Sequence, residues 1–117
     1  MRMLGEGLRA PHLIDLEVLS VIRSAVAAGD VTAARAGRAV ANLRILPIQR
    51  SNHVRLIQRC WELRDNVTPY DAAYVALAEA TSSLLLTADG RLARAPGIRC
   101  EVEVLVVPHE PTKPEAQ

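Results

Sequence analysis

The chain has 117 residues, close to the usual size of a single domain, and half of them are hydrophobic. This composition and a formal net charge of +1 argue against a disordered chain and give no strong electrostatic signal for nucleic-acid binding. No apolar run approaches the roughly 20 residues that a membrane-spanning helix needs.

The start of the chain and its cysteines indicate a cytoplasmic protein. The N-terminal sequence MRMLGEGLRAP lacks the apolar stretch of a secretory signal. Cys60 and Cys100 have neither the spacing of a metal site nor that of a disulfide framework. We therefore expect both to be reduced thiols.

The spacing of apolar residues predicts that helices and strands alternate along the chain. In chain order we expect a loop or helix end at 1–11, helices at 12–28 and 31–43, a strand at 43–49, helices at 51–63 and 69–80, a strand at 82–89, a helical turn at 90–95 and a strand at 101–107. This alternation predicts an α/β domain with a mainly parallel sheet at residues 1–107. Residues 108–117 are polar and contain proline, so they predict a mobile tail.

Single residues suggest where several of these elements begin or end. Gly29 can end the first helix, and Asp30 can cap the second. Ser51 can cap the third helix, and Pro47 places the first predicted strand at an edge of the sheet. The run SSLLLTAD at 82–89 is apolar and ends in an acid, as buried parallel strands often do.

Two aspartates occur in the stretch TPYDAAYVALAEATSSLLLTADG, residues 68–90. Asp71 follows Thr68 in the T-x-x-D pattern of a helix capping box, and Asp89 can cap the helical turn that follows its strand. Taken singly, each has a sufficient structural explanation. However, ligands in parallel α/β sheets bind beyond the carboxyl ends of the strands, where Asp89 is expected to lie.

Two more acids flank the apolar face of the first helix. Glu17 lies about 80° from the centre of that face at 100° per residue, and Asp15 lies about as far away on the other flank. A carboxylate in such a position is costly unless it is paired. Spacing alone gives no reason to prefer Glu17 over Asp15.

A group of carboxylates favours a particular chemistry, because the repelling acids need a cation between them. Mg²⁺ takes oxygen ligands and can polarise a phosphodiester and activate a water molecule, so no nucleophilic side chain is required. The sequence offers no such nucleophile: it has no Ser-His-Asp pattern, and Cys60 has apolar neighbours. His12, His53 and His109 lack metal-ligand spacing and are expected at the surface or at element boundaries.

Three segments together resemble the PIN domain, and within that family the VapC toxins of bacterial toxin–antitoxin pairs. They are APHLIDLEVLSVIR at 10–23, TPYDAAYVALAEA at 68–80 and SLLLTADGRLARA at 83–95. The resemblance extends from Glu6 to Val107, with the motifs in the family's order. It implies a three-layer α/β/α fold.

The resemblance also implies a function and assigns the site. It implies a metal-dependent endoribonuclease that acts on RNA, often tRNA or rRNA, binds Mg²⁺ or Mn²⁺, commonly dimerises and is blocked by a VapB-type antitoxin. The site acids that it implies are Glu17, from the L-E-V-L motif, Asp71 and Asp89. On this basis, and not on spacing, Glu17 is preferred to Asp15.

The sequence departs from the family at its start, because the first strand, its V-D-A-S aspartate and the following helix have no counterpart. One expectation is that the coding sequence begins upstream. Another is a catalytically impaired remnant that only binds an antitoxin or associates with itself. A phosphoacceptor receiver domain is disfavoured because the only lysine, Lys113, lies in the tail.

Overall fold

Helices and short strands alternate along residues 7–106, the part of the chain that this computed structural model describes. The elements are β1 (Leu8–Pro11), α1 (Ile14–Ala27), α2 (Ala33–Ile45), β2 (Ile48–Ser51), the 3-10 turn η1 (Val54–Leu56), α3 (Ile57–Glu62), α4 (Pro69–Ala80), β3 (Leu85–Thr87), α5 (Gly90–Ala93) and β4 (Val102–Val104). The predicted tail at 108–117 lies outside the described residues. The α/β class expected from the sequence is confirmed.

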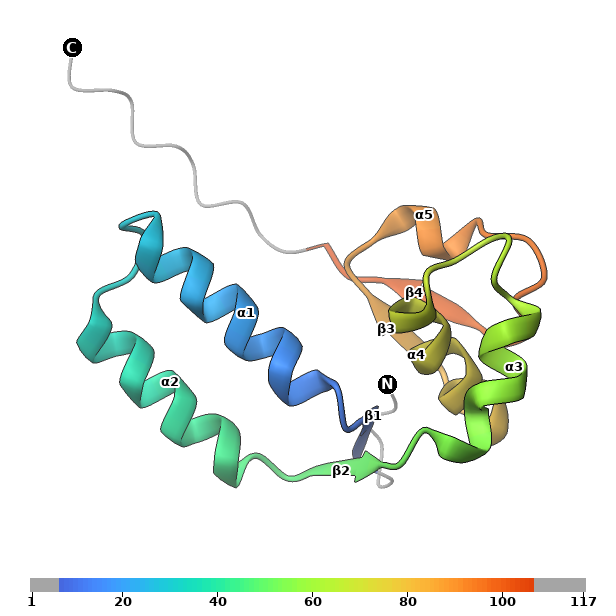
Figure 1. Ribbon diagram of the computed structural model, residues 1–117, viewed down its shortest axis with the longest axis horizontal. Helices are drawn as coiled ribbons and strands as arrows, with labels where there is room; N and C mark the ends of the chain where they lie inside the picture. The colour runs from blue at the N-terminus through green and yellow to red at the C-terminus, as the bar shows by residue number, and fades with distance from the viewer. Residues whose placement is uncertain (1–6, 107–117) are drawn as a thin grey trace, which may run out of the picture.

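The four described strands form two separate parallel pairs (Figure 1). β1 pairs with β2, with Leu8 opposite Ile48, and β3 pairs with β4, with Leu85 opposite Val102. The predicted parallel pairing is therefore correct, but the strands of residues 7–106 do not join into one sheet. Between β1 and β3 lies a cavity of about 120 Å³, which side chains of α4 also line.

Helix α4 supplies more of the buried core than any other described element and contacts α3, β1 and β3. Its buried residues are Ala72, Ala73, Val75, Ala76, Leu77 and Ala78. The small alanine side chains let the neighbouring elements approach the helix closely, and Leu63, Leu85 and Leu92 complete the main apolar cluster. By contrast, α1 has no buried residue and forms a hairpin with α2 that stands apart from this core in Figure 1.

The helix at 69–80 has the bounds that the sequence predicts, and its cap is the predicted one. The Thr68 hydroxyl accepts a hydrogen bond from the Asp71 backbone N–H at 3.2 Å, and Pro69 occupies the first turn. Asp89 likewise caps α5, as expected, by accepting from the Arg91 N–H at 2.9 Å. Both candidate aspartates therefore lie where the local sequence places them.

Several predicted elements are wrong in type or extent. The helix expected at 51–63 is reduced to η1 and α3, and the strand expected at 82–89 is reduced to β3. Residues 8–11 form strand β1 where a loop or helix end was expected, because their backbone pairs with β2. The expected strand at 43–49 begins later, at Ile48, because α2 continues through Ile45. A short apolar run fits a helix end as well as a strand, and only pairing decides between them.

Two predicted caps are also wrong. Thr32, not Asp30, caps α2, because its hydroxyl accepts from the Arg35 N–H at 3.2 Å. Ser51 belongs to β2, and the Asn52 side chain accepts the Val54 N–H at 2.8 Å instead. Thr32 lies two residues beyond the predicted cap of α2, whereas η1 follows His53, which forms no side-chain cap.

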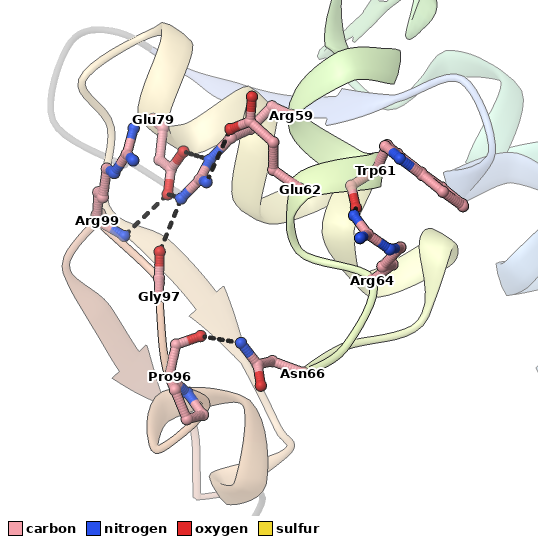
Figure 2. A network of polar contacts seen from close by, with 9 residues as sticks. All are labelled: Arg59, Trp61, Glu62, Arg64, Asn66, Glu79, Pro96, Gly97 and Arg99. Carbon is pink, nitrogen blue, oxygen red and sulfur yellow. Dashed lines mark hydrogen bonds and ion pairs between the residues drawn. The ribbon is translucent and has the colours of Figure 1, made fainter.

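A polar network fixes α3 and α4 to the loop before β4 (Figure 2). The Arg59 guanidinium donates to both carboxylate oxygens of Glu79, at 2.7 and 3.1 Å, and to the Gly97 carbonyl at 2.7 Å. Glu79 also accepts from the Arg99 backbone N–H at 2.8 Å. The Glu79 side chain is only 13% exposed, so this carboxylate depends on its partners for compensation.

Cys60 and Cys100 are free thiols that pack partly buried against the main apolar cluster. Burial raises the pKa of both thiols, so both favour the protonated form. Among residues 7–106, none of the helices has the length and apolar character that crossing a membrane requires.

Ser82 ends helix α4 in a strained conformation, and its replacement by glycine should stabilise the protein. Its φ is +50°, while the Ser82 and Ser83 N–H groups donate to the carbonyls of Glu79 and Ala78 in a Schellman arrangement. Because glycine adopts positive φ without strain, we expect Ser82→Gly to add about 0.5–1 kcal/mol to the free energy of unfolding. Thermal unfolding should show a midpoint raised by about 3–6 °C.

The control for this prediction is Ser20→Gly, at an exposed position inside α1. The same substitution there should lower the free energy of unfolding by about 0.5–1 kcal/mol, because glycine weakens a helix interior. An unfolding midpoint of Ser82→Gly at or below that of the wild type would contradict the strain at Ser82.

Candidate active site

Asp71 carries an uncompensated charge at the start of α4. Its backbone N–H is used by the Thr68 cap, but its carboxylate forms no hydrogen bond or ion pair with any residue in the range 7–106. The positive end of the helix dipole favours a negative charge there. The side chain is partly buried, so its oxygens are held at the surface and remain available to a ligand.

Asp89 lies beyond the end of β3, and its carboxylate is oriented by the start of α5. Its Oδ1 accepts from the Arg91 backbone N–H at 2.9 Å and from Arg91 Nε at 3.3 Å. These two interactions, the backbone one first, lower the pKa of Asp89. The Arg91 side chain is 87% exposed, so the ion pair is one that solvent or another cation can replace.

Asp71 and Asp89 line the same surface depression, which has a volume of about 270 Å³. Asn66, Thr68 and Arg91 also line it, so the depression combines two carboxylates with neutral polar groups and one guanidinium. The start of α4 and the carboxyl end of β3 thus meet at one place.

Glu17 is held differently, by a hydroxyl group. Its Oε1 accepts a hydrogen bond of 2.5 Å from the Tyr74 phenol, which reaches it from α4. Burial of Tyr74 and the negative charges of Glu17, Asp71 and Asp15 raise the pKa of the phenol well above its usual range. Tyr74 thus joins α4 to Glu17 of α1 through a hydrogen bond.

Asp15 differs from Glu17 because an arginine neutralises it. Arg50 of β2 donates from Nε and Nη2 to the Asp15 carboxylate at 2.7–2.9 Å. This pairing lowers the pKa of Asp15, and Arg50 also donates to the Leu43 carbonyl. Asp15 thus joins α1 to β2, while Glu17 forms no ion pair and has a second oxygen without a partner in residues 7–106.

These acids do not form a complete metal cage. Within residues 7–106, no three or more His, Cys, Asp or Glu side chains are grouped so that they could hold a metal ion. Asp71 and Asp89 share a depression, whereas Glu17 does not line it and contacts Tyr74. The convergence of all three carboxylates stays a prediction.

The donors nevertheless suit a hard cation such as Mg²⁺, which usually takes one or two carboxylates and several waters from its site. Asp71 supplies a free carboxylate, and Asp89 supplies one whose present partner is an exposed arginine. His12 and His53 are exposed, and neither lines this depression.

Comparison with known proteins identifies the family. A family model of the PIN domain matches residues 2–98. Ribonuclease VapC1 of Mycobacterium tuberculosis (strain ATCC 25618 / H37Rv) is 47% identical over 97 residues, which cover 82% of this chain and 73% of the relative. The chain belongs to the PIN-domain family.

Two further relatives of this PIN domain come from the same strain. Ribonuclease VapC9 is 41% identical over 101 residues, covering 86% of this chain and 80% of the relative. Ribonuclease VapC12 is 38% identical over 104 residues, covering 89% of this chain and 81% of the relative. The resemblance to VapC proteins is therefore confirmed over most of the chain, and the matched residues include the three candidate acids.

In this PIN domain, Tyr74 and Arg91 contact the candidate acids although sequence reasoning did not single them out. Tyr74 follows the candidate Asp71 by three positions, in D-A-A-Y, and Arg91 follows the candidate Asp89 by two, in D-G-R. The spacing of Asp71 and Tyr74 places both on one face of α4. That spacing is the signal from which Tyr74 could have been found.

Proposed function

We propose that this chain is a VapC-like toxin, a Mg²⁺- or Mn²⁺-dependent endoribonuclease that hydrolyses RNA phosphodiester bonds in the cytoplasm. The observation that carries the proposal is the unpaired Asp71 carboxylate beside Asp89 in one depression. An acid that no arginine compensates, in a chain related to ribonucleases, is best explained by a cationic ligand.

In this proposal Asp71, Asp89 and Glu17 hold the metal ion. When bound, the ion polarises the phosphodiester, lowers the pKa of an attacking water and stabilises the leaving oxygen. Thr68 keeps Asp71 in place by engaging its backbone N–H. The exposed guanidinium of Arg91 lies beside Asp89 in the same depression, where it would bind a phosphate of the RNA.

We further propose the partners that the VapC family implies: tRNA or rRNA as substrate, a VapB-type antitoxin that blocks the site, and a second copy of the chain. Large apolar side chains support a protein partner, because they lie exposed on the described surface. They include Leu16, Val21, Ile57, Trp61 and Tyr70. Contiguous exposed apolar surface commonly marks a protein interface.

The second candidate function is a remnant that has lost catalysis and only binds an antitoxin or associates with itself. It is favoured by one observation: the carboxylates of residues 7–106 do not form a group of three that could hold a metal ion. This candidate and the nuclease make opposite predictions about RNA cleavage.

The test is metal dependence of cleavage by the purified chain. Mixed tRNA and rRNA should be cut in millimolar Mg²⁺ or Mn²⁺, uncut in excess EDTA, and cut again when metal is restored, because the ion supplies the attacking water. Cleavage that persists in EDTA would contradict the metal-dependent mechanism. No cleavage with either metal, together with binding to a VapB-type antitoxin, would favour the remnant.

A further inference from the structure

Asn66 lies in the turn between α3 and α4 and lines the same depression as Asp71 and Asp89. Its backbone N–H donates to the Leu63 carbonyl at 3.0 Å, which closes the turn. Its side-chain nitrogen donates to the Pro96 carbonyl at 3.0 Å and so joins two segments that lie 30 positions apart in the sequence (Figure 2). The Asn66 side chain is therefore held in place although it lies at the surface.

The hydrogen bond to Pro96 determines which way the amide of Asn66 faces. A carbonyl oxygen can only accept, so the amide nitrogen lies toward Pro96 and the amide oxygen lies away from it, as Figure 2 shows. The loop that carries Pro96 is itself fixed, because the Gly97 carbonyl accepts from Arg59 at 2.7 Å. Asn66 Oδ1 forms no hydrogen bond with any residue in the range 7–106, so it is an oriented acceptor that a ligand can use.

The other polar side chains that line the depression have different uses. The Thr68 hydroxyl oxygen accepts the Asp71 backbone N–H at 3.2 Å and thereby caps α4. Asp71 and Asp89 are the carboxylates that the proposed function assigns to the metal ion, and the Arg91 guanidinium can only donate. Among the described side chains of this depression, Asn66 is thus the one that offers a neutral acceptor without a partner.

The proposed reaction requires such an acceptor if it is to be selective for RNA. When a metal-activated water attacks a phosphodiester, the 2′-hydroxyl of the ribose takes no part, so the chemistry by itself would hydrolyse DNA as readily as RNA. Selectivity must then come from contacts to the sugar, and the 2′-hydroxyl is the group that distinguishes RNA from DNA. A hydroxyl group that donates needs an acceptor, and a neutral acceptor does not repel the phosphates on either side.

We propose that Asn66 determines the selectivity for RNA, with its Oδ1 accepting a hydrogen bond from the 2′-hydroxyl of a nucleotide bound in the depression. The inference rests on the proposed function, because it needs RNA to bind beside Asp71 and Asp89. One neutral hydrogen bond of this kind corresponds to about a 3- to 10-fold difference in kcat/KM.

The experiment combines a change in the protein with a change in the substrate. A single-stranded RNA with one cleavage site is made with a 2′-deoxyribose at each nucleotide around that site in turn, and kcat/KM of the full chain is measured in saturating Mg²⁺. At one position the missing hydroxyl should lower kcat/KM of the wild type about 3- to 10-fold. Asn66→Ala should lower kcat/KM for the unmodified RNA by a similar factor, and the 2′-deoxyribose at that position should then cause no further loss.

This design separates contact with the sugar from a role in folding, because each variant is compared with itself on two substrates and any loss of folded protein cancels in the ratio. Asn42→Ala is the matched control, at an exposed position on α2 away from the depression. It should keep the wild-type response to the 2′-deoxyribose.

Three results would count against these ideas in different ways. If no 2′-deoxy position lowers kcat/KM of the wild type, the inference is overturned even where Asn66→Ala fails to fold. If Asn66→Ala responds to every 2′-deoxy position as the wild type does, Asn66 only joins the turn to Pro96, and the proposed function stands without the inference. If the wild type cuts no RNA with Mg²⁺ or Mn²⁺, the proposed function itself fails and the inference fails with it.

Discussion

Replacing Asp71 with asparagine should lower Mg²⁺-dependent RNA cleavage at least about a hundredfold, because it removes a charge that the metal ion needs and changes little else. The Thr68 cap uses the backbone N–H of residue 71, so it survives the substitution. The cost in folding should be limited to the lost interaction with the helix dipole, about 0.3–1 kcal/mol. Cleavage rates at saturating Mg²⁺, measured together with thermal unfolding, would separate the two effects.

Two further variants sharpen this test. Asp89→Asn should also abolish cleavage while α5 keeps its cap, because asparagine caps a helix about as well as aspartate. Asp65→Asn is the control, since Asp65 lies exposed in the turn before α4 and forms no ion pair in the described residues. Wild-type cleavage by Asp71→Asn would remove this acid from the site.

The parts of the fold that were predictable are those in which local chemistry and tertiary packing agree. Helix α4 has a capping threonine, a proline in its first turn and continuous apolar residues behind them, so its bounds follow from sequence. Strand β1 has four residues, of which the last is Pro11, and exists only because β2 pairs with it. The separation of the strands into two pairs likewise depends on long-range pairing, which no local pattern contains.

In the candidate site, too, local features could be predicted from the sequence and long-range contacts could not. Local sequence placed Asp71 at the start of a helix and Asp89 after a strand, but only the resemblance to the PIN domain assigned both to one site. Glu17 and Asp15 could not be distinguished by spacing, since both flank the apolar face of one helix. What separates them is the partner that the fold brings to each, an arginine from β2 for Asp15 and a phenol from α4 for Glu17.

The largest effect on stability is expected at Glu79, outside the candidate site. Glu79→Gln should lower the free energy of unfolding by about 2 kcal/mol, because Arg59 then loses a partner with which it forms two charge-assisted hydrogen bonds in a mostly buried place. The unfolding midpoint should fall by about 10 °C. The network also fixes the loop at Gly97, so the loss should be cooperative across α3, α4 and β4 (Figure 2).

Glu62→Gln provides the matched control, because Glu62 contacts the same arginine. Its ion pair with Arg59 is longer, at 3.3 Å, and its side chain is 46% exposed. Solvent screens such a pair, so the free energy of unfolding of Glu62→Gln should fall by roughly 0.5 kcal/mol or less. Equal losses in Glu62→Gln and Glu79→Gln would show that burial does not set the strength of this network.

The dependence of stability on pH should identify the lost charge of Glu79 as the cause of the lower stability of Glu79→Gln. Hydrogen bonds from Arg59 hold the pKa of Glu79 below its ordinary value of 4.5 in the folded protein. A carboxylate with a lowered folded pKa contributes stability that is fully present above the unfolded pKa and is lost as pH falls through the folded one. The stability difference between the wild type and Glu79→Gln should therefore be constant near neutral pH and shrink below about pH 4.5, whereas a difference that persists in acid would indicate lost packing and not lost charge.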